Sequence, residues 1–199
     1  GFYYAPVNPD FEAPEGELPP LIVNVHGGPT SAVRPGLQIP FQYWTSRGFA
    51  VLDVNFRGST SFGRPYRERL NGNWGVMDVQ DCIDGAQYLI DLGRVDPRRI
   101  AIRGRSSGGF TVLNALASSD VFTAGASFSG IADLAKLAET SHKFESHYDG
   151  ILLGTFDRSD PVWTQRSPIN RVAEITAPLL LLQGTADPVV PASQAQEMY

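Results

Sequence analysis

Residues 100–110 read IAIRGRSSGGF, and the fold that the sequence predicts depends on this stretch. Residues 100–103 form a short, mainly apolar run typical of a buried strand, and the apolar side chains of Phe110 and Leu113 then follow at helical spacing. Between them, Ser106 has one glycine two residues before it and another two residues after it, which is the G-x-S-x-G pattern of a nucleophile elbow. Glycine suits such an elbow because the arms of a sharp strand-to-helix turn approach too closely for a Cβ atom.

Ser106 has two interpretations at this point. In the first, its hydroxyl attacks a carbonyl carbon, and backbone N–H groups of the following helix stabilise the resulting oxyanion. In the second, it is only the N-cap of a helix that begins in a glycine-rich turn. The pattern by itself occurs often by chance, but its position between a strand and a helix favours the nucleophile.

The rest of the chain alternates short apolar runs with helical patterns. The apolar runs suit strands buried on both faces, as in parallel sheets, and lie at residues 21–25, 50–55, 125–128 and 179–183. Helices are expected at residues 38–47, at 78–92 with Asp78 as the N-cap, at 107–118, and from Pro191 onward. An edge strand is expected within residues 2–7, and a less regular region with helices over the site at 131–171. This alternation predicts a doubly wound, mostly parallel α/β sheet, in one domain over residues 1–199.

The composition is that of an ordinary globular protein and excludes several classes of function. A net charge of −5 lacks the basic stripe of nucleic-acid-binding proteins, and no apolar run reaches the ~20 residues of a membrane span. The N-terminus has no secretory pattern. We therefore expect no nucleic-acid or membrane partner, and a cytoplasmic location. The single cysteine, Cys82, lies on an apolar helical face and is expected to be a buried structural thiol.

A second glycine-rich segment, VHGGP at residues 25–29, directly follows the first strong strand. In α/β hydrolases an H-G-G segment at this place supplies a backbone N–H to the oxyanion hole. Gly27 and Gly28 would let the main chain approach a substrate without interference from side chains, and the alternative is a turn with no such role. His26 is expected to order the loop by hydrogen bonding rather than to act as a base.

A candidate acid follows the last apolar run. Asp187 lies in the segment GTADPVVP at residues 184–191, on the loop where that strand ends. Ligand chemistry in open α/β sheets concentrates at the carboxyl ends of the strands. Asp187 also follows Ser106 in the order Ser, Asp, His that a catalytic triad has on this fold. The alternative is a simple turn, since aspartate before proline often forms one.

The histidine that such a triad needs is not evident. The chain has only His26, His142 and His147, and none of them follows Asp187. His142 and His147 would break the expected order, and their spacing of five does not place two metal ligands on one helical face. We expect no metal and no cofactor, and a general base that lies outside residues 1–199.

Taken together, these segments resemble the prolyl oligopeptidase family of serine peptidases, on its acylaminoacyl-peptidase and dipeptidyl-peptidase side. The resemblance covers nearly the whole chain. The N-terminal segment YAPVNPDF at residues 4–11 is similar to the corresponding segment of bacterial aminopeptidases that hydrolyse puromycin. Its matching segments are HGGP at 26–29, NFRGSTSFG at 55–63, NWG at 73–75 with Asp78 and Asp81, VDPRRI at 95–100, RSP at 166–168 and GTADPVVP at 184–191.

The resemblance implies an α/β-hydrolase fold with Ser106 as the nucleophile and Asp187 as the triad acid. It also implies that the N–H groups of Gly28 and Ser107 are the oxyanion donors and that short peptides or amino-acyl compounds are the substrates. An oligomer is compatible with it. It further implies an N-terminal β-propeller and a C-terminal segment with the histidine, neither of which is in this chain, so the 199 residues alone are expected to hydrolyse little or nothing. Arg105 stands where the family often has a small residue or histidine, and it is expected to pair with a carboxylate or to touch substrate.

Two other functions remain open on the sequence alone. A carboxylesterase or lipase would use the same triad on an ester. A non-catalytic binding domain could keep the fold without the chemistry.

Overall fold

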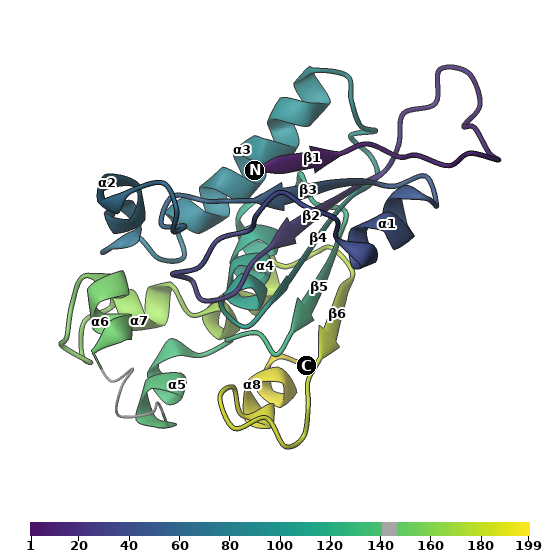
Figure 1. Cartoon of the computed structure of the whole chain (residues 1–199). Coiled ribbons are helices and arrows are strands. Elements are labelled where there is room, and N and C mark those ends of the chain that lie inside the picture. The colour runs from purple at the N-terminus through teal and green to yellow at the C-terminus, as the bar shows by residue number, and fades with distance from the viewer. Residues whose placement is uncertain (141–146) are drawn as a thin grey trace.

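The computed structural model describes residues 1–140 and 147–199. Within these residues a six-stranded sheet has the order β1-β3-β2-β4-β5-β6. Strands β2 to β6 run parallel, whereas β1 pairs antiparallel with β3 at one edge (Figure 1). The strands are β1 (Phe2–Tyr4), β2 (Leu21–Val25), β3 (Ala50–Val54), β4 (Ile100–Arg105), β5 (Ala124–Phe128) and β6 (Leu179–Leu182). The predicted mostly parallel sheet and the edge strand expected within residues 2–7 are confirmed, and the structure adds that this edge strand is antiparallel.

The helices follow the predicted alternation closely. The α-helices are α1 (Ile39–Thr45), α2 (Arg64–Arg67), α3 (Met77–Asp91), α4 (Ser107–Ser118), α5 (Leu134–Thr140), α6 (Tyr148–Leu153), α7 (Val162–Gln165) and α8 (Ala192–Met198), and two 3₁₀ helices span Glu68–Leu70 and Pro168–Glu174. Helix α4 coincides with its expected range. The prediction of Asp78 as a helix N-cap is wrong, because α3 begins one residue earlier and Val76 is its N-cap.

Helices cover both faces of the sheet. The Leu52 side chain of β3 packs under Gly85 of α3, so α3 lies on the Leu52 face. Tyr4 of β1, which is paired with Val51, packs at a tilt against Phe41 of α1, with 5.3 Å between the ring centroids. Because successive side chains of a strand point to opposite faces, α1 and α3 lie on opposite sides of the sheet. The doubly wound arrangement is therefore confirmed.

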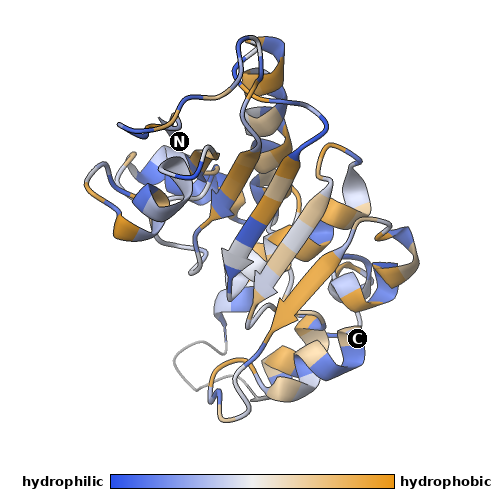
Figure 2. Ribbon diagram, turned by 90° about the vertical axis from the view of Figure 1, so that its right-hand side faces the viewer, coloured by the Kyte–Doolittle hydropathy of each residue, from blue (hydrophilic) through white to orange (hydrophobic). Residues whose placement is uncertain are grey.

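Edge strand β6 is less well covered than the central strands. It consists of four leucines and appears as a continuous apolar strand in Figure 2. Leu180 and Leu182 are 56% and 40% exposed, whereas Ile100 and Ile102 of β4 are almost completely buried. The core is therefore concentrated under the middle of the sheet, where β4 lies between β2 and β5.

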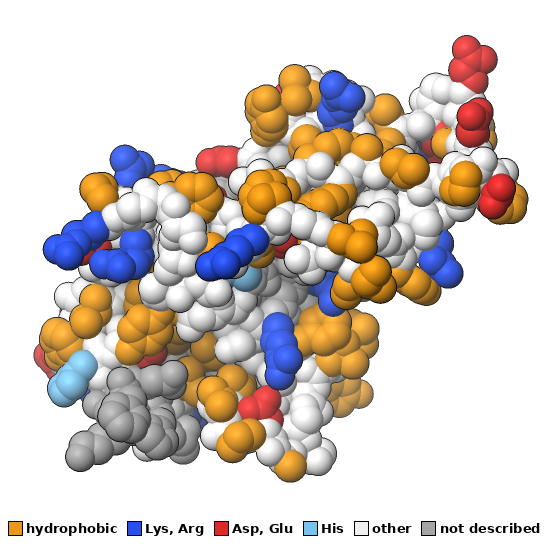
Figure 3. Space-filling model, in the orientation of Figure 1, with side chains coloured by type: hydrophobic (Ala, Val, Ile, Leu, Met, Phe, Trp, Pro, Cys, Tyr) orange, Lys and Arg blue, Asp and Glu red, His pale blue; other side chains and the backbone are white. Residues whose placement is uncertain are grey.

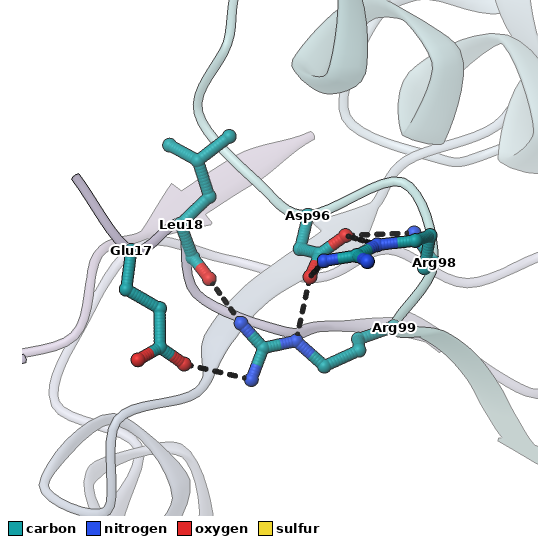
Figure 4. A network of polar contacts seen from close by, with 5 residues as sticks. All are labelled: Glu17, Leu18, Asp96, Arg98 and Arg99. Atoms are coloured by element: carbon teal, nitrogen blue, oxygen red, sulfur yellow. Dashed lines mark hydrogen bonds and ion pairs between the residues drawn. The ribbon is translucent and has the colours of Figure 1, made fainter.

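A polar clasp fixes the lead-in segment to the amino end of β4 (Figure 4). The Arg99 guanidinium forms ion pairs with Glu17 (3.0 Å) and Asp96 (2.8 Å), and it donates to the Leu18 carbonyl oxygen (2.6 Å). Arg98 contacts the same Asp96 carboxylate at 3.2 Å. Side-chain and backbone hydrogen bonds from Arg98 lower the pKa of Asp96 to about 2. This clasp lies at the amino ends of the strands, whereas Ser106 lies at their carboxyl ends.

Candidate active site

Ser106 lies at the sharp turn between β4 and α4. Its backbone angles, φ 55° and ψ −122°, fall in a region that side chains other than glycine rarely adopt. The turn is held by hydrogen bonds from Ser106 N–H to the Phe128 carbonyl oxygen (2.9 Å) and from Phe110 N–H to the Ser106 carbonyl oxygen (3.0 Å). The Ser106 side chain does not cap the helix, and its hydroxyl has no hydrogen-bond partner among the described residues. The N-cap interpretation therefore does not account for this serine.

Two glycines allow the turn to be this tight. A Cβ atom on Gly104 would collide with the backbone of Gly108, and one on Gly108 would collide with the carbonyl oxygen of Val25 in β2. The close approach at Gly104 is between the two arms of the elbow. The one at Gly108 is between the start of α4 and the neighbouring strand β2. The steric reason for glycine that the sequence predicted is therefore present at both positions.

Buried polar groups support the elbow from behind. Ser107 is almost fully buried, and its hydroxyl oxygen accepts a hydrogen bond from Trp74 Nε1 (3.2 Å). One turn later, the Thr111 hydroxyl donates to the buried Asp78 carboxylate (2.5 Å), which also accepts the Gly75 N–H (2.7 Å). Burial raises the pKa of Asp78 to about 6, because the charged carboxylate is deprived of water. These residues fix the first turn of α4 relative to α3.

The loop after β2 presents Gly28 at the same edge of the sheet. Gly28 has a φ of 128°, which favours glycine, and it precedes a cis peptide bond to Pro29. Gly27 lies against the elbow, since a Cβ atom there would be 2.9 Å from the Arg105 carbonyl oxygen. Within residues 1–140 and 147–199, the N–H groups of Gly28 and Ser107 have no hydrogen-bond acceptor.

His26 orders this loop, as predicted. Its Nδ1–H donates to the Gly27 carbonyl oxygen (2.8 Å), so the neutral ring accepts at Nε2 from the Ser59 hydroxyl (2.8 Å). The ring is stacked on Phe56 with centroids 4.4 Å apart. Burial lowers the pKa of His26 and keeps the ring neutral near pH 7. With both nitrogens engaged, His26 has no free nitrogen for proton transfer.

Asp187 lies on the loop that follows β6. Its Oδ1 accepts the N–H groups of Val189 and Val190, each at 3.0 Å, so it does form the turn expected of an Asp-Pro sequence. These two bonds, together with a hydrogen bond from the Ser129 side chain, are the main causes of a lowered Asp187 pKa. Because β4, β5 and β6 are parallel neighbours, the residues that follow them lie at one edge of the sheet. Ser106, Ser129 and Asp187 are such residues.

The remaining candidates differ in their placement. Arg105 is exposed at the end of β4 and forms no ion pair with the described residues, although its charge contributes to the lowered Asp187 pKa. Of the two alternatives expected for Arg105, an ion pair with a carboxylate is therefore not found in the described parts of the chain. His147 is exposed and meets the edge of the Phe156 ring at 5.8 Å. His142 lies outside the described residues.

The surface over this edge is hollowed. Figure 3 shows a recess lined mostly by backbone and by side chains that are neither apolar nor charged, with Lys and Arg side chains around it. In the described parts of the chain no group of three or more His, Cys, Asp or Glu residues could hold a metal ion. Nor does any helix there combine the length and the apolar character needed to cross a membrane. Cys82 is free and fully buried, as predicted, and burial raises the pKa of its thiol.

A serine at a sharp strand-to-helix turn, with a glycine-rich loop and an acidic loop beside it at the carboxyl ends of a doubly wound sheet, is typical of the α/β-hydrolase class. The profile of the prolyl oligopeptidase family matches residues 35–199, and the chain belongs to this family. A puromycin-hydrolysing peptidase of Mycobacterium tuberculosis is 49% identical, with a TM-score of 0.96 over 98% of this chain and 30% of that one.

Other relatives lie on the peptidase branches that the sequence indicated. Dipeptidyl aminopeptidase BIII of Pseudoxanthomonas mexicana is 35% identical over 90% of this chain and 27% of its own length. An acylaminoacyl peptidase in complex with Z-Gly-Gly-Phe-chloromethyl ketone is 30% identical, with a TM-score of 0.89 over 99% of this chain and 31% of that one. The chain thus spans about a third or less of the relatives it matches.

Some residues that shape the site were not foreseen as such. Asn55 binds the loop after β2 through Val33, accepting its N–H (2.9 Å) and donating to its carbonyl oxygen (3.1 Å). Asn55 and Ser59 belong to the NFRGS segment, so the family resemblance was their only signal. Tyr148, which contacts the loop at Thr30, belongs to no pattern that the sequence reveals.

Proposed function

We infer that this chain is the catalytic α/β domain of a serine peptidase that cleaves peptide or amino-acyl amide bonds of short substrates. The observation that carries this function is the Ser106 elbow, because a serine is held there in a rare backbone conformation and its hydroxyl has no hydrogen-bond partner in the described parts of the chain. Membership of the prolyl oligopeptidase family, and a relative solved with a peptidyl chloromethyl ketone, support a peptide-like substrate.

In the proposed reaction, Ser106 Oγ attacks the carbonyl carbon of the scissile amide while its proton passes to a general base. The N–H groups of Gly28 and Ser107 stabilise the negative oxygen of the tetrahedral intermediate. The C–N bond then breaks, the amine leaves with the proton from the base, and an acyl-enzyme remains. Water attacks this ester, the base takes up its proton, and the acid product leaves as Ser106 regains a hydrogen.

We propose that the base is a histidine outside residues 1–199, oriented by Asp187. The lowered Asp187 pKa supports this role, since the carboxylate stays charged at neutral pH and can stabilise an imidazolium. His26 is a poor base because both of its nitrogens are already engaged. The small fraction of each relative that the chain covers is compatible with a further segment that carries the histidine.

Substitution of the nucleophile tests this function in the full-length protein. Ser106→Ala should lower kcat/KM on a short peptide anilide by roughly 10⁴-fold or more, and Asp187→Asn by a comparable factor. A fluorophosphonate probe should label the parent protein but not Ser106→Ala. Turnover by Ser106→Ala close to the wild-type rate would refute the mechanism. Turnover confined to simple acyl esters would identify an esterase instead.

A further inference from the structure

A tyrosine from a distant segment holds the loop that carries Gly28. The Thr30 N–H donates to the Tyr148 hydroxyl oxygen at 3.0 Å, and this hydroxyl also lies 2.5 Å from Thr30 Oγ1. Tyr148 is the first residue of α6, 118 positions further along the chain. Figure 1 shows the loop after β2 extending toward α6 and α7.

The helix that carries Tyr148 is itself attached to the support of the elbow. The carbonyl oxygens of Ile151 and Leu152 in α6 accept the N–H groups of Gly72 (3.0 Å) and Trp74 (3.2 Å), respectively. Trp74 also donates from its indole to Ser107. Leu152 is nearly fully buried, so α6 is packed as well as hydrogen-bonded. Through α6 and Trp74, Tyr148 thereby connects the loop that carries Gly28 to the first turn of α4.

Other hydrogen bonds from outside hold this loop only before Gly27 and after Thr30. His26 and Ser59 fix it before Gly27, and Thr60 N–H fixes the Ser31 carbonyl oxygen (2.7 Å) after it. For residues 27–30, Tyr148 supplies the only hydrogen bonds from outside the loop within the described parts of the chain, both of them to Thr30.

We propose that Tyr148 is a positioning residue for the oxyanion site. By fixing Thr30, its hydroxyl keeps the Gly28 N–H, two residues earlier, aimed at the point that the Ser107 N–H also faces. Two donors stabilise a tetrahedral oxyanion fully only when both reach it at about 2.7–3.1 Å. This positioning role rests on the proposed function, but the tether, meaning the hydrogen bonds between Tyr148 and Thr30, does not.

Hydrogen exchange tests the tether on the chain itself. Tyr148→Phe keeps the ring and removes the acceptor, so the Thr30 amide proton should exchange about tenfold faster or more. The Thr60 amide, which binds the Ser31 carbonyl oxygen, serves as the internal reference and should not change. An unchanged Thr30 exchange rate would overturn the proposal.

Kinetics of the full-length protein test the consequence. Tyr148→Phe should lower kcat about tenfold with little change in KM, since a misplaced oxyanion donor weakens the transition state and not the bound substrate. Affinity for a peptide aldehyde, which forms a tetrahedral adduct with the serine, should fall by the same factor. Tyr3→Phe is the matched control, because its hydroxyl contacts only the Arg94 carbonyl oxygen (3.5 Å) in the described structure.

The outcomes separate the two proposals. Wild-type kcat and aldehyde affinity in Tyr148→Phe, together with an inactive Ser106→Ala, would overturn the positioning role and leave the peptidase intact. A loss that appears only in KM would also overturn it, because it would indicate substrate binding. Full turnover by Ser106→Ala would reject the proposed function, and the exchange rate of Thr30 would still decide whether the tether exists.

Discussion

Replacing Asp78 by asparagine should stabilise the protein at high pH but not at low pH. Asp78 is completely buried behind the elbow, and burial raises its pKa from 3.8 to about 6. The native protein therefore binds this proton more tightly than the unfolded chain does. The stability gained from the neutral carboxyl is fully present below the unfolded pKa, and it is lost as the pH rises through about 6. Above that pH the native state contains a buried charge.

The size of the effect follows from the two pKa values. One pKa unit corresponds to ~1.4 kcal/mol, so a rise from 3.8 to about 6 corresponds to about 3 kcal/mol of unfolding free energy. Asparagine has the same shape and can keep both contacts. Its carbonyl accepts the Gly75 N–H, its amide donates to Thr111 Oγ1, and the Thr111 hydroxyl then donates to the Ser107 carbonyl oxygen (3.1 Å). The substitution removes the charge without opening a cavity.

The assay is urea unfolding of the wild type and Asp78→Asn at about pH 4 and about pH 8. The stability difference between them should shift by about 2 kcal/mol in favour of the variant at the higher pH, because part of the full effect is already lost at pH 4. Asp84→Asn is the matched control, because Asp84 is an exposed carboxylate on the same helix, bound by Gln80 (2.7 Å). A difference for Asp78→Asn that is equal at both pH values would refute the reasoning. The Arg166 guanidinium interacts electrostatically with Asp78 and stays charged throughout this range.

Three further substitutions probe the packing around the elbow, each by the shift in urea midpoint. Gly108→Ala should destabilise by about 2–3 kcal/mol, because the new methyl group meets the Val25 carbonyl oxygen, and an unchanged midpoint would contradict the tight elbow. Leu113→Ala, at a side chain that is 1% exposed, should cost about 3 kcal/mol, and a loss below ~1 kcal/mol would indicate a loosely packed site. Trp74→Phe keeps an aromatic ring but removes the donor to Ser107, and it should cost about 1 kcal/mol, with a stabilising effect as the contradicting result.

The fold could be predicted because its signals are local. Each buried parallel strand is a short apolar run bounded by glycine, proline or polar residues, and α4 begins where the glycines of the elbow allow a tight turn. The residues at which the strands and helices end were predicted less accurately. Strand β4 continues two residues beyond its expected end, because Gly104 and Arg105 pair with Ser127 and Phe128 of β5.

The candidate site was predictable as far as it depends on strand ends. A parallel sheet brings the residues that follow its strands to one edge, so Ser106 and Asp187 share that edge however far apart they lie in the sequence. The supports of the site were not predictable, because they join distant segments without any repeated pattern. Gln194 of α8, for example, accepts the N–H groups of Ala132 and Asp133 at 2.8 Å each. Such a contact appears only after the chain has folded.

The four leucines of β6 have a practical consequence for anyone who handles these 199 residues in isolation. An apolar strand at a sheet edge offers unpaired main-chain groups to another molecule, and this strand has neither proline nor charge to prevent such pairing. Self-association should therefore begin at Leu179–Leu182 and increase steeply with concentration. A lysine at the most exposed of these positions, Leu180, is the simplest way to keep a sample monodisperse.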